Sequence, residues 1–407
     1  MALRYLTAGE SHGPALTGIL EGMPAGVPIG SEAIARQLAR RRVGHGRSPR
    51  MLFEVDDLEL LGGVRHGRTL GSPVALVIRN TEWDRWREAM SPEVPEDPEA
   101  VAATGRGAPL TRPRPGHADL VGSQKYDYAD VRDALERASA RETAMRVGLG
   151  AVARALLEEL GVRLVSHTVR IGAVAREHDA GWPAPDEQPR IDEDPVRCAD
   201  PEVSAAMQEA IDAAKAARDT LGGVIEVVAT GLPPGLGSHV HWDRKLDARL
   251  AHALMSVQAF KGVEVGDGFA TAAAPGSAAH DEIALGDEGY ARRTDRAGGL
   301  EAGMSTGAPL RVRAAMKPLS SLTQPLETVD VATGEEAHAI TQRSDVCAVP
   351  RAGVVLEAVV AIELASALLE KTGGDSLGEV RRNLEGYREQ VRARTPQPSA
   401  TDEVTRG

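Results

Sequence analysis

The hydrophobic pattern between residues 129 and 160 is the most regular in the chain. Apolar side chains recur there at steps of three, four or seven residues, as on one face of an α-helix. The positions are Val131, Leu135, Ala138, Met145, Leu149, Val152, Leu156 and Leu160. We therefore predict one helix over this stretch, capped at its start by Asp127 or Asp130 and ended by Gly161.

Helical patterns also occur in four other stretches. They predict helices over residues 31–41, 203–218, 243–260 and 352–371. Ser31 is the expected cap of the first helix. The last segment is apolar almost throughout, but Glu357 and Glu363 interrupt it. Because charges within a span disfavour a bilayer, we predict a buried or interface helix and no membrane association.

Strand patterns are short and lie among many glycines and prolines. The strand candidates are residues 3–8, 73–78, 222–232 and 310–316. Strands and helices do not alternate regularly and no linker separates the two halves, so we predict an α+β fold in one large domain, residues 1–389. The coarse order of elements repeats in the two halves, which indicates an internal duplication. Residues 176–206 read as a surface excursion, and residues 390–407 as a disordered tail.

Composition narrows the class of protein. The chain has 407 residues and a net charge of −12, and the acidic balance argues against general nucleic-acid binding. Its two cysteines, Cys198 and Cys347, are far apart and form no metal or disulfide motif, which agrees with a reducing, cytoplasmic location. The N-terminus shows no basic-then-apolar leader pattern.

The segment "GESHG", residues 9–13, fits the G-x-S-x-G pattern of hydrolase nucleophiles. That interpretation requires a strand, a sharp turn at Ser11 and then a helix. Pro14, Pro24 and Pro28 follow instead, with several glycines, so the downstream stretch reads as strand and turns. The elbow interpretation is therefore disfavoured, and His12 remains open as an exposed loop-edge histidine.

Cationic side chains gather in residues 36–50. Six arginines occur there without an acidic residue: Arg36, Arg40, Arg41, Arg42, Arg47 and Arg50. In an acidic protein such a block predicts a focused site for phosphate or carboxylate groups. The alternative is a solvated helix face whose acidic partners lie elsewhere in the sequence.

Two further stretches carry candidate chemistry. In "RPRPGHAD", prolines stiffen a loop that holds Arg112, Arg114 and His117, and a histidine can transfer a proton near neutral pH. The alternative is a rigid surface turn. In "ERASARETAMR", Glu142 falls on the apolar stripe, so it needs a partner there, or the stripe faces a polar site.

Two late segments add polar groups. Lys317, Ser320 and Ser321 can hold a phosphate with backbone amides, and Asp345 can act as a base. The sequence shows no metal-ligand cluster and no clear nucleophile. We therefore predict a polyanionic ligand, with chemistry that is proton transfer or elimination, or that a cofactor supplies.

At these residues the sequence resembles the chorismate synthase family. The motifs occur in the family's order over residues 3–385: "GESHGPALTGILEGMPAGVPI", "TEW", "RPRPGHAD", "ERASARETAMRVGLG", "GVEVGDGF", "GGLEAGMSTG", "MKPLSS" and "QRSDVCAVPRAG". The resemblance implies a β-α-β sandwich, a homotetramer and a lyase. Its reaction would be 1,4-elimination of phosphate from 5-enolpyruvylshikimate 3-phosphate to give chorismate, with reduced FMN and no net redox change.

The resemblance also implies residue roles. His12 would protonate the leaving phosphate, His117 would lie near the flavin, and Asp345 would assist beside it. The implied flavin contacts are Arg137, Ala138, Ser139, Gln258, Ala259, Ala302, Lys317, Pro318, Leu319, Ser320, Ser321 and Arg343. Arg41 and Arg47 would bind either NADP or substrate. No nicotinamide fingerprint is evident, so we expect an external flavin reductant, with NADPH as a possible source of electrons.

Two other functions remain compatible with the residues alone. A non-catalytic polyanion-binding protein would use the same arginines without releasing phosphate. An ordinary flavin oxidoreductase would consume NADPH.

Overall fold

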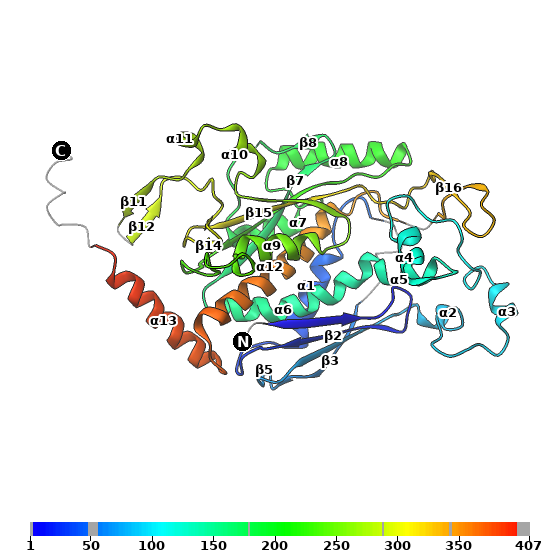
Figure 1. Ribbon diagram of the computed structural model, residues 1–407, viewed down its shortest axis with the longest axis horizontal. Helices are drawn as coiled ribbons and strands as arrows, with labels where there is room; N and C mark the ends of the chain where they lie inside the picture. Colours follow the sequence, from blue (N-terminus) through cyan, green and yellow to red (C-terminus); the bar gives the residue numbers. More distant parts are fainter. Residues whose placement is uncertain (1–2, 48–55, 178–179, 287–288, 342–343, 397–407) are drawn as a thin grey trace.

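Two antiparallel sheets enclose a layer of helices in the computed structural model (Figure 1). The structure describes residues 3–47, 56–177, 180–286, 289–341 and 344–396. The first sheet has the order β1 (Arg4–Ala8), β2 (Ala15–Glu21), β6 (Val74–Arg79) and β3 (Asp57–Gly62). The second has the order β10 (Phe260–Val265), β15 (Leu310–Met316), β9 (Gly223–Thr230), β7 (Arg163–Ile171) and β8 (Val174–Ala175). Each of the four predicted strand segments overlaps one of these strands, namely β1, β6, β9 and β15.

Four helices fill the space between the sheets. They are α1 (Ser31–Arg41), α6 (Thr143–Glu159), α9 (Leu246–Met255) and α12 (Val349–Thr372). The remaining helices are α2 (Trp83–Trp86), α3 (Pro98–Ala102), α4 (Asp119–Tyr126), α5 (Arg132–Ala138), η2 (Ala140–Glu142), η3 (Pro185–Glu187), α7 (Gln188–Glu193), α8 (Pro201–Ala216), η4 (Trp242–Arg244), α10 (Phe269–Ala273), α11 (Gly276–Ala279) and α13 (Leu377–Ala393). The small hairpins are β4 (Val64–Arg65) with β5 (Arg68–Thr69), β11 (Ile283–Gly286) with β12 (Gly289–Arg292), β13 (Leu300–Glu301) with β14 (Met304–Ser305), and β16 (Glu327–Val329) with β17 (Glu336–His338).

The two sheets share one topology, as the predicted duplication requires. If the four main strands of the first sheet are numbered along the chain, their order across the sheet is one, two, four, three. The strands β7, β9, β15 and β10 have the same order across the second sheet. In each half a core helix follows the second and the fourth strand: α1 and α6, then α9 and α12. The fold is therefore α+β, with two β-β-α-β-β-α units whose helices meet face to face.

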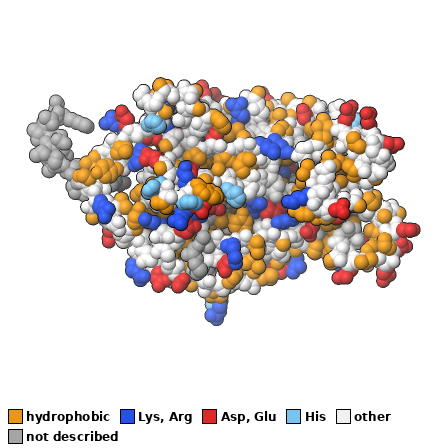
Figure 2. All heavy atoms as spheres, in the orientation of Figure 1, with side chains coloured by type: hydrophobic (Ala, Val, Ile, Leu, Met, Phe, Trp, Pro, Cys, Tyr) orange, Lys and Arg blue, Asp and Glu red, His pale blue; other side chains and the backbone are white. Residues whose placement is uncertain are grey.

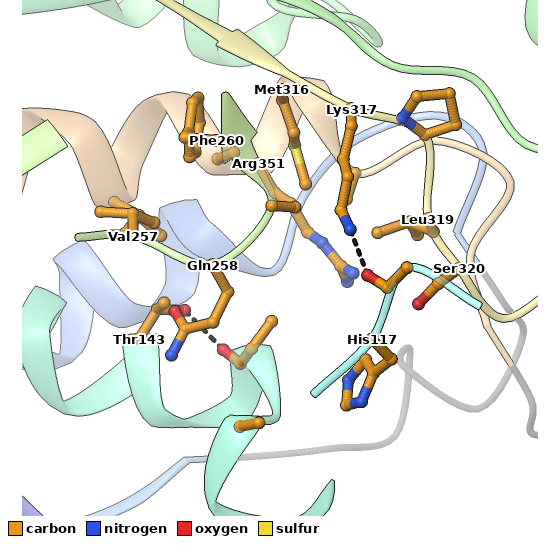
Figure 3. A pocket seen from close by; sticks show the side chains of 18 of the residues that line it. His117, Thr143, Val257, Gln258, Phe260, Met316, Lys317, Leu319, Ser320 and Arg351 are labelled. Atoms are coloured by element: carbon orange, nitrogen blue, oxygen red, sulfur yellow. Dashed lines mark hydrogen bonds between the residues drawn. The ribbon is translucent and has the colours of Figure 1, made fainter. Parts of the chain in front are cut away.

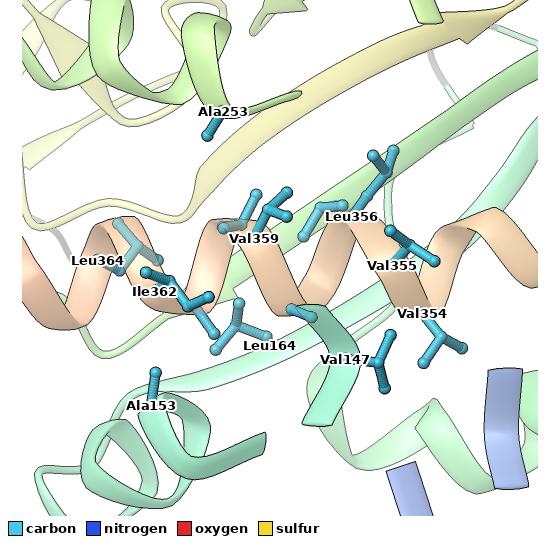
Figure 4. Close-up of a cluster of buried hydrophobic side chains, with 14 of the residues drawn as sticks. Val147, Ala153, Leu164, Ala253, Val354, Val355, Leu356, Val359, Ile362 and Leu364 are labelled. Atoms are coloured by element: carbon cyan, nitrogen blue, oxygen red, sulfur yellow. The ribbon is translucent and has the colours of Figure 1, made fainter. Parts of the chain in front are cut away.

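α12 forms the centre of the core (Figure 4). It is long and apolar enough to span a membrane, yet its side chains are nearly all buried inside the sandwich. A helix that is apolar all round needs such surroundings. In Figure 4, Val354 lies beside Val147 of α6, and Ile362 lies beside Leu164 of β7. The prediction of a buried helix is confirmed, although the helix begins three residues earlier than expected.

The predicted helix over residues 129–160 is broken. α5 ends at Ala138, Ser139 is extended (φ −62°, ψ 141°), and η2 and α6 follow. The Ser139 hydroxyl accepts the backbone N–H of Arg141, and a serine that bonds locally in this way competes with the helix. At the start, Val131 and not Asp127 or Asp130 is the N-cap of α5, and no side chain caps it; Asp130, one residue earlier, accepts the backbone N–H of Arg132 (2.8 Å). Periodicity missed the break because apolar residues are buried on both sides of it, Val131 and Leu135 before Ser139 and Met145 and Leu149 after it.

Two other boundaries differ from expectation. Gly30, not Ser31, is the N-cap of α1, and no side chain caps that end, so Ser31 is simply the first helical residue. α9 is shorter than predicted because the chain turns at Ala259 (φ 71°) to enter β10.

Helix α13 extends into the segment predicted to be a disordered tail. It runs to Ala393, which corrects residues 390–393 to helix; residues 397–407 lie outside the described residues. A capping box of Ser376 and Glu379 begins the helix. Leu384 is buried, and the Tyr387 hydroxyl donates to the carbonyl oxygen of Pro234 (2.8 Å). One face of the helix therefore packs on the domain, which tail composition did not reveal.

Candidate active site

A cavity of about 320 Å³ opens beside the end of β15 and the start of α12 (Figure 3). Its wall comes from segments far apart in the sequence: the loop at residues 116–118, the α5–η2 break, the turn before β10, the end of β15 and the start of α12. The lining residues are Arg41, Gly116, His117, Ala118, Ala138, Ala140, Thr143, Val257, Gln258, Ala259, Phe260, Met316, Lys317, Pro318, Leu319, Ser320, Ala348, Arg351, Ala352 and Val355.

The wall combines apolar and cationic side chains. Phe260, Met316 and Val355 contribute apolar surface, while Lys317 and Arg351 contribute positive charge. A ligand that fits has a flat apolar part and anionic groups, because each part of the wall is complementary to one of these.

Lys317 connects two parts of the wall. Its ammonium group donates to the carbonyl oxygen of Gly116, and its backbone N–H donates to the carbonyl oxygen of Ala259 (3.0 Å). Burial and the nearby charge of Lys261 lower the pKa of Lys317. An anion in the cavity would offset both effects.

His117 lies on the wall in a cluster with a buried carboxylate. Its Nδ1 contacts Asp119, which also accepts from the Nε of Arg114 (2.8 Å). The Nη1 of Arg114 donates to the hydroxyl of Ser321 (2.8 Å), so the cluster reaches the segment after β15. Burial alone would raise the pKa of Asp119, but bonds from His117 and Arg114 hold it well below its usual range. The cluster fixes Nδ1, which leaves Nε2 for a ligand.

His12 lies beside the cavity but does not line it. Its Nδ1 lies 2.8 Å from an oxygen of Glu136, and its ring stacks on Trp86 with centroids 4.0 Å apart. The neighbouring hydroxyl of Ser11 accepts from the hydroxyl of Ser139 (3.2 Å), between two lining alanines.

The G-x-S-x-G segment is a turn between antiparallel strands. β2 follows it, paired with β1, where a nucleophile elbow would continue into a helix. The backbone N–H of Ser11 donates to the carbonyl oxygen of Glu136 (3.1 Å), which ties the turn to α5. The topology therefore excludes the elbow interpretation.

Within the described residues, the arginines of the block lie in different surroundings, which corrects the prediction that they form one focused anion site. Arg36 pairs with Glu32, and Arg40 pairs with Glu357 and Asp192 in the interior. Among the described residues of the block, Arg41 is the one that lines the cavity, and its Nη2 donates to the carbonyl oxygen of Ala140 (3.2 Å). Successive residues of a helix point about 100° apart, so neighbouring arginines face different surroundings. Arg50 lies outside the described residues.

Positive and negative side chains are also interspersed over the face shown in Figure 2. On that face, cationic groups do not gather into one broad surface. The cavity therefore owes its positive character to a few inward-facing groups.

Several expected site residues lie next to the cavity rather than on its wall. Arg137 donates to the carbonyl oxygens of Thr7 (2.9 Å) and Gly9 (3.1 Å) and so anchors the segment before His12. Asp345 is buried and forms an ion pair with Arg351, which lines the cavity. Arg47 follows Gly46, whose carbonyl oxygen accepts the N–H of Val346.

Two expected flavin contacts are not placed at the cavity. Ala302 lies in the β13–β14 hairpin with φ 50° and is not among the lining residues. Arg343 lies outside the described residues. The lining does include Ala138, Gln258, Ala259, Pro318, Leu319 and Ser320, besides Lys317.

Sequence reasoning missed the groups that hold the two histidines. Glu136, Asp119 and Trp86 were not singled out, and neither was Arg351. The H-x-D spacing of His117 and Asp119 was a usable local signal, whereas His12 and Glu136 are 124 positions apart. Glu142 was singled out, and it has partners: it accepts from Thr7 (2.7 Å) and Gln258 (3.2 Å).

No metal centre is evident within the described ranges, because no three His, Cys, Asp or Glu side chains there are placed to share an ion. The fold and the cavity instead define an α+β enzyme that binds an anionic, partly apolar ligand beside two positioned imidazoles. The family model described as chorismate synthase matches residues 3–369.

Relatives and a solved structure agree with that match. The chain is 63% identical to a chorismate synthase of Thermobifida fusca, over 95% of this chain and 98% of that protein. It is 64% identical to one from Acidothermus cellulolyticus, with the same coverage. A crystal structure of chorismate synthase, 40% identical, covers 97% of this chain and 99% of its own, with a TM-score of 0.77. The chain therefore belongs to the chorismate synthase family, the lyases of the last step of the shikimate pathway.

Proposed function

We propose that the chain eliminates phosphate from 5-enolpyruvylshikimate 3-phosphate to give chorismate, with reduced FMN as cofactor. The observation that carries this proposal is one cavity that combines apolar walls, Arg41, Lys317 and Arg351, and a carboxylate-held His117. The substrate has two carboxylates and a phosphate, which suit the guanidinium groups of Arg41 and Arg351, while Lys317 is left for the phosphate of FMN.

The cavity residues fit a flavin. Apolar Val257, Phe260 and Leu319 offer surface to a flat ring, and Lys317 and Ser320 offer donors to a phosphate. The side-chain oxygen of Gln258 is buried, and no donor within the described residues bonds to it. Such an acceptor is suited to a ring N–H of a ligand. A bound reduced flavin would supply electron density for the departure of the phosphate, with no net redox change over the whole reaction.

The chain's own groups bind the substrate and move protons. We assign the Arg41 and Arg351 guanidinium groups to the substrate's anions, and Arg41 to substrate rather than NADP because it lines this cavity. As the C3–O bond breaks, His12 donates a proton to the departing phosphate. Asp345, held by Arg351, assists loss of the C6 proton. The electron pair of the C6–H bond completes the diene.

Anaerobic assays test this proposal. With photoreduced FMN we expect equal amounts of phosphate and chorismate, without consumption of NADPH. His12→Ala and His117→Ala should each lower kcat by about 10²–10⁴-fold, the usual contribution of general acid–base catalysis. His241→Ala is the matched control, because His241 is exposed and pairs with Asp243, and it should keep the wild-type rate.

The alternative functions give different results in the same assay. Binding of the substrate without phosphate release would identify a non-catalytic polyanion-binding protein. Stoichiometric NADPH oxidation would identify a flavin oxidoreductase. We also propose that the flavin is reduced by an external reductant. We further propose a homotetramer, and sedimentation equilibrium tests this oligomeric state directly.

A further inference from the structure

We propose that Glu136 is a positioning residue that fixes the tautomer of His12, so that Nε2 is the nitrogen that exchanges a proton with the substrate. This inference rests on the proposed function, because it concerns the residue assigned as the proton donor. It adds a second buried carboxylate to the site besides the one that holds His117.

Glu136 holds the side chain and the backbone of His12 at once. One carboxylate oxygen lies 2.8 Å from the ring Nδ1, and the other accepts the backbone N–H of His12 at 2.8 Å. The side chain of Glu136 is 1% exposed, whereas that of His12 is 21% exposed. A carboxylate accepts and does not donate, so Nδ1 must carry a proton and Nε2 is the variable position.

Trp86 limits the ring from a second direction. It stacks on His12 with an interplanar angle of 27°, and the guanidinium carbons of Arg106 and Arg132 lie 5.8 Å from its centroid. A carboxylate at one edge and an indole on one face leave the imidazole little freedom to rotate. The geometry therefore selects one tautomer in one orientation.

The two histidine–carboxylate pairs differ in how the carboxylate is shared. Asp119 accepts from Arg114 as well as from His117. Within the described residues, the hydrogen bonds of the Glu136 carboxylate all come from the ring Nδ1 and the backbone N–H of His12 itself. Loss of the Glu136 charge should therefore affect His12 specifically.

Glu136→Gln tests the tautomer because it changes the hydrogen-bonding capacity and keeps the shape. An amide has one acceptor oxygen for two donors, the ring Nδ1–H and the backbone N–H. If the oxygen keeps the backbone N–H, the amide NH₂ faces Nδ1 and drives the ring proton to Nε2. In a serine protease triad the analogous Asp→Asn change lowers kcat by about 10⁴-fold through the wrong tautomer.

The experiment uses the full chain labelled with ¹⁵N-histidine, with His12 resonances identified from their absence in His12→Ala. For the neutral form of wild-type His12, the state left after Nε2 has given up its proton, we expect the remaining proton on Nδ1, and in Glu136→Gln we expect that proton on Nε2 instead. The kcat of Glu136→Gln should fall by about 10²–10⁴-fold. FMN affinity should change by less than about 3-fold, because Glu136 is not a lining residue.

Glu226→Gln is the matched control. Glu226 is buried and lies 2.9 Å from Nε2 of His167, so it forms a similar pair on the second sheet. It does not line the cavity. Glu226→Gln should lower stability and leave the His12 resonances and kcat unchanged. A loss of kcat in both variants with an unchanged His12 tautomer would overturn the proposal.

A conservative variant keeps the test decisive if Glu136→Gln does not fold. Glu136→Asp retains two acceptors on a shorter side chain, so we expect the Nδ1–H tautomer, a reduced kcat and at least about tenfold more activity than in His12→Ala. A wild-type kcat together with an Nε2–H tautomer would contradict the inference. A wild-type protein that releases no phosphate would contradict the proposed function alone, because the NMR result on His12 does not depend on turnover.

Discussion

Lys317 shows how a single side chain in this cavity is prepared for an anion. Its ammonium group is partly buried, near Lys261 and bonded to the carbonyl oxygen of Gly116. Its pKa is lowered from the ordinary 10.5, so the isolated cation is less stable here than in water. A phosphate would relieve that cost.

We therefore expect Lys317→Gln to weaken FMN binding by about 10–100-fold, the range for one charge-assisted hydrogen bond. Since the ammonium form binds the anion, wild-type affinity should fall as the pH rises through the lowered pKa of Lys317. The variant should lack that fall. Fluorescence titration of FMN at several pH values measures both effects.

Lys261→Gln is the control for this prediction. Lys261 is an exposed neighbour that does not line the cavity, so its loss should change FMN affinity by less than about 3-fold. Equal losses in the two variants would show that Lys317 acts only through the local charge.

At the scale of elements, close contact between α6 and α12 joins the two halves of the sandwich. A Cβ added at Gly150 would lie 2.5 Å from the Cβ of Ala358 and 2.8 Å from its carbonyl oxygen. Only glycine permits this approach without movement of a helix. The contact joins two helices whose first turns both line the cavity, α6 through Thr143 and α12 through Arg351 and Ala352.

Gly150→Ala should lower the free energy of unfolding by about 1–3 kcal/mol because of overpacking. The sign of this change distinguishes packing from helix propensity, since propensity alone would make the alanine variant more stable by about 1 kcal/mol. Gly386→Ala in α13, where a Cβ meets nothing within 4 Å, should show that gain alone. Urea unfolding followed by circular dichroism compares them, and stabilisation of both variants would contradict the packing argument.

At the scale of the whole molecule, a buried charge cluster connects the layers. Glu357 on α12 accepts from Arg40 of α1 (2.7 Å) and Arg154 of α6 (2.7 Å) and pairs with Arg197 (3.3 Å). Ser166 of β7 also donates to it (2.6 Å). Burial alone would raise the pKa of Glu357, but the three arginines hold it well below its usual range. Removal of this one carboxylate would leave buried cations uncompensated.

Glu357→Gln should therefore lower the free energy of unfolding by about 3–5 kcal/mol at pH 7. The pKa of Glu357 is lower in the folded protein than in the unfolded chain, where it is 4.5. The ionised carboxylate therefore stabilises the folded state fully at pH values above 4.5, and this stabilisation is lost as the pH falls from 4.5 toward the folded-state pKa. The difference between wild type and variant should shrink below pH 4.5. Urea midpoints measured from pH 7 to pH 4 give this dependence.

Glu59→Gln serves as the reference for this series, since Glu59 forms an exposed pair with Arg79 on the first sheet. Its midpoint should match that of the wild type. A constant difference between wild type and Glu357→Gln at every pH would contradict the assignment of the stabilisation to the ionised carboxylate.

The sequence by itself determined the kinds of elements and much of the cavity wall. Periods of two and of three to four residues indicated the core strands and helices, because burial on one face leaves that pattern. The stiff loop at His117 and the segment at Lys317 were also visible, since each is local.

Only the tertiary structure decided which charged groups serve the cavity and which serve the core. Arg40 and Arg41 are adjacent in the sequence, yet one neutralises Glu357 and the other lines the cavity. Glu136 reaches His12 across 124 positions, and Ser139 interrupts a helix whose apolar pattern continues. Local periodicity carries no record of contacts closed over such distances, because they depend on how segments far apart in the sequence pack together.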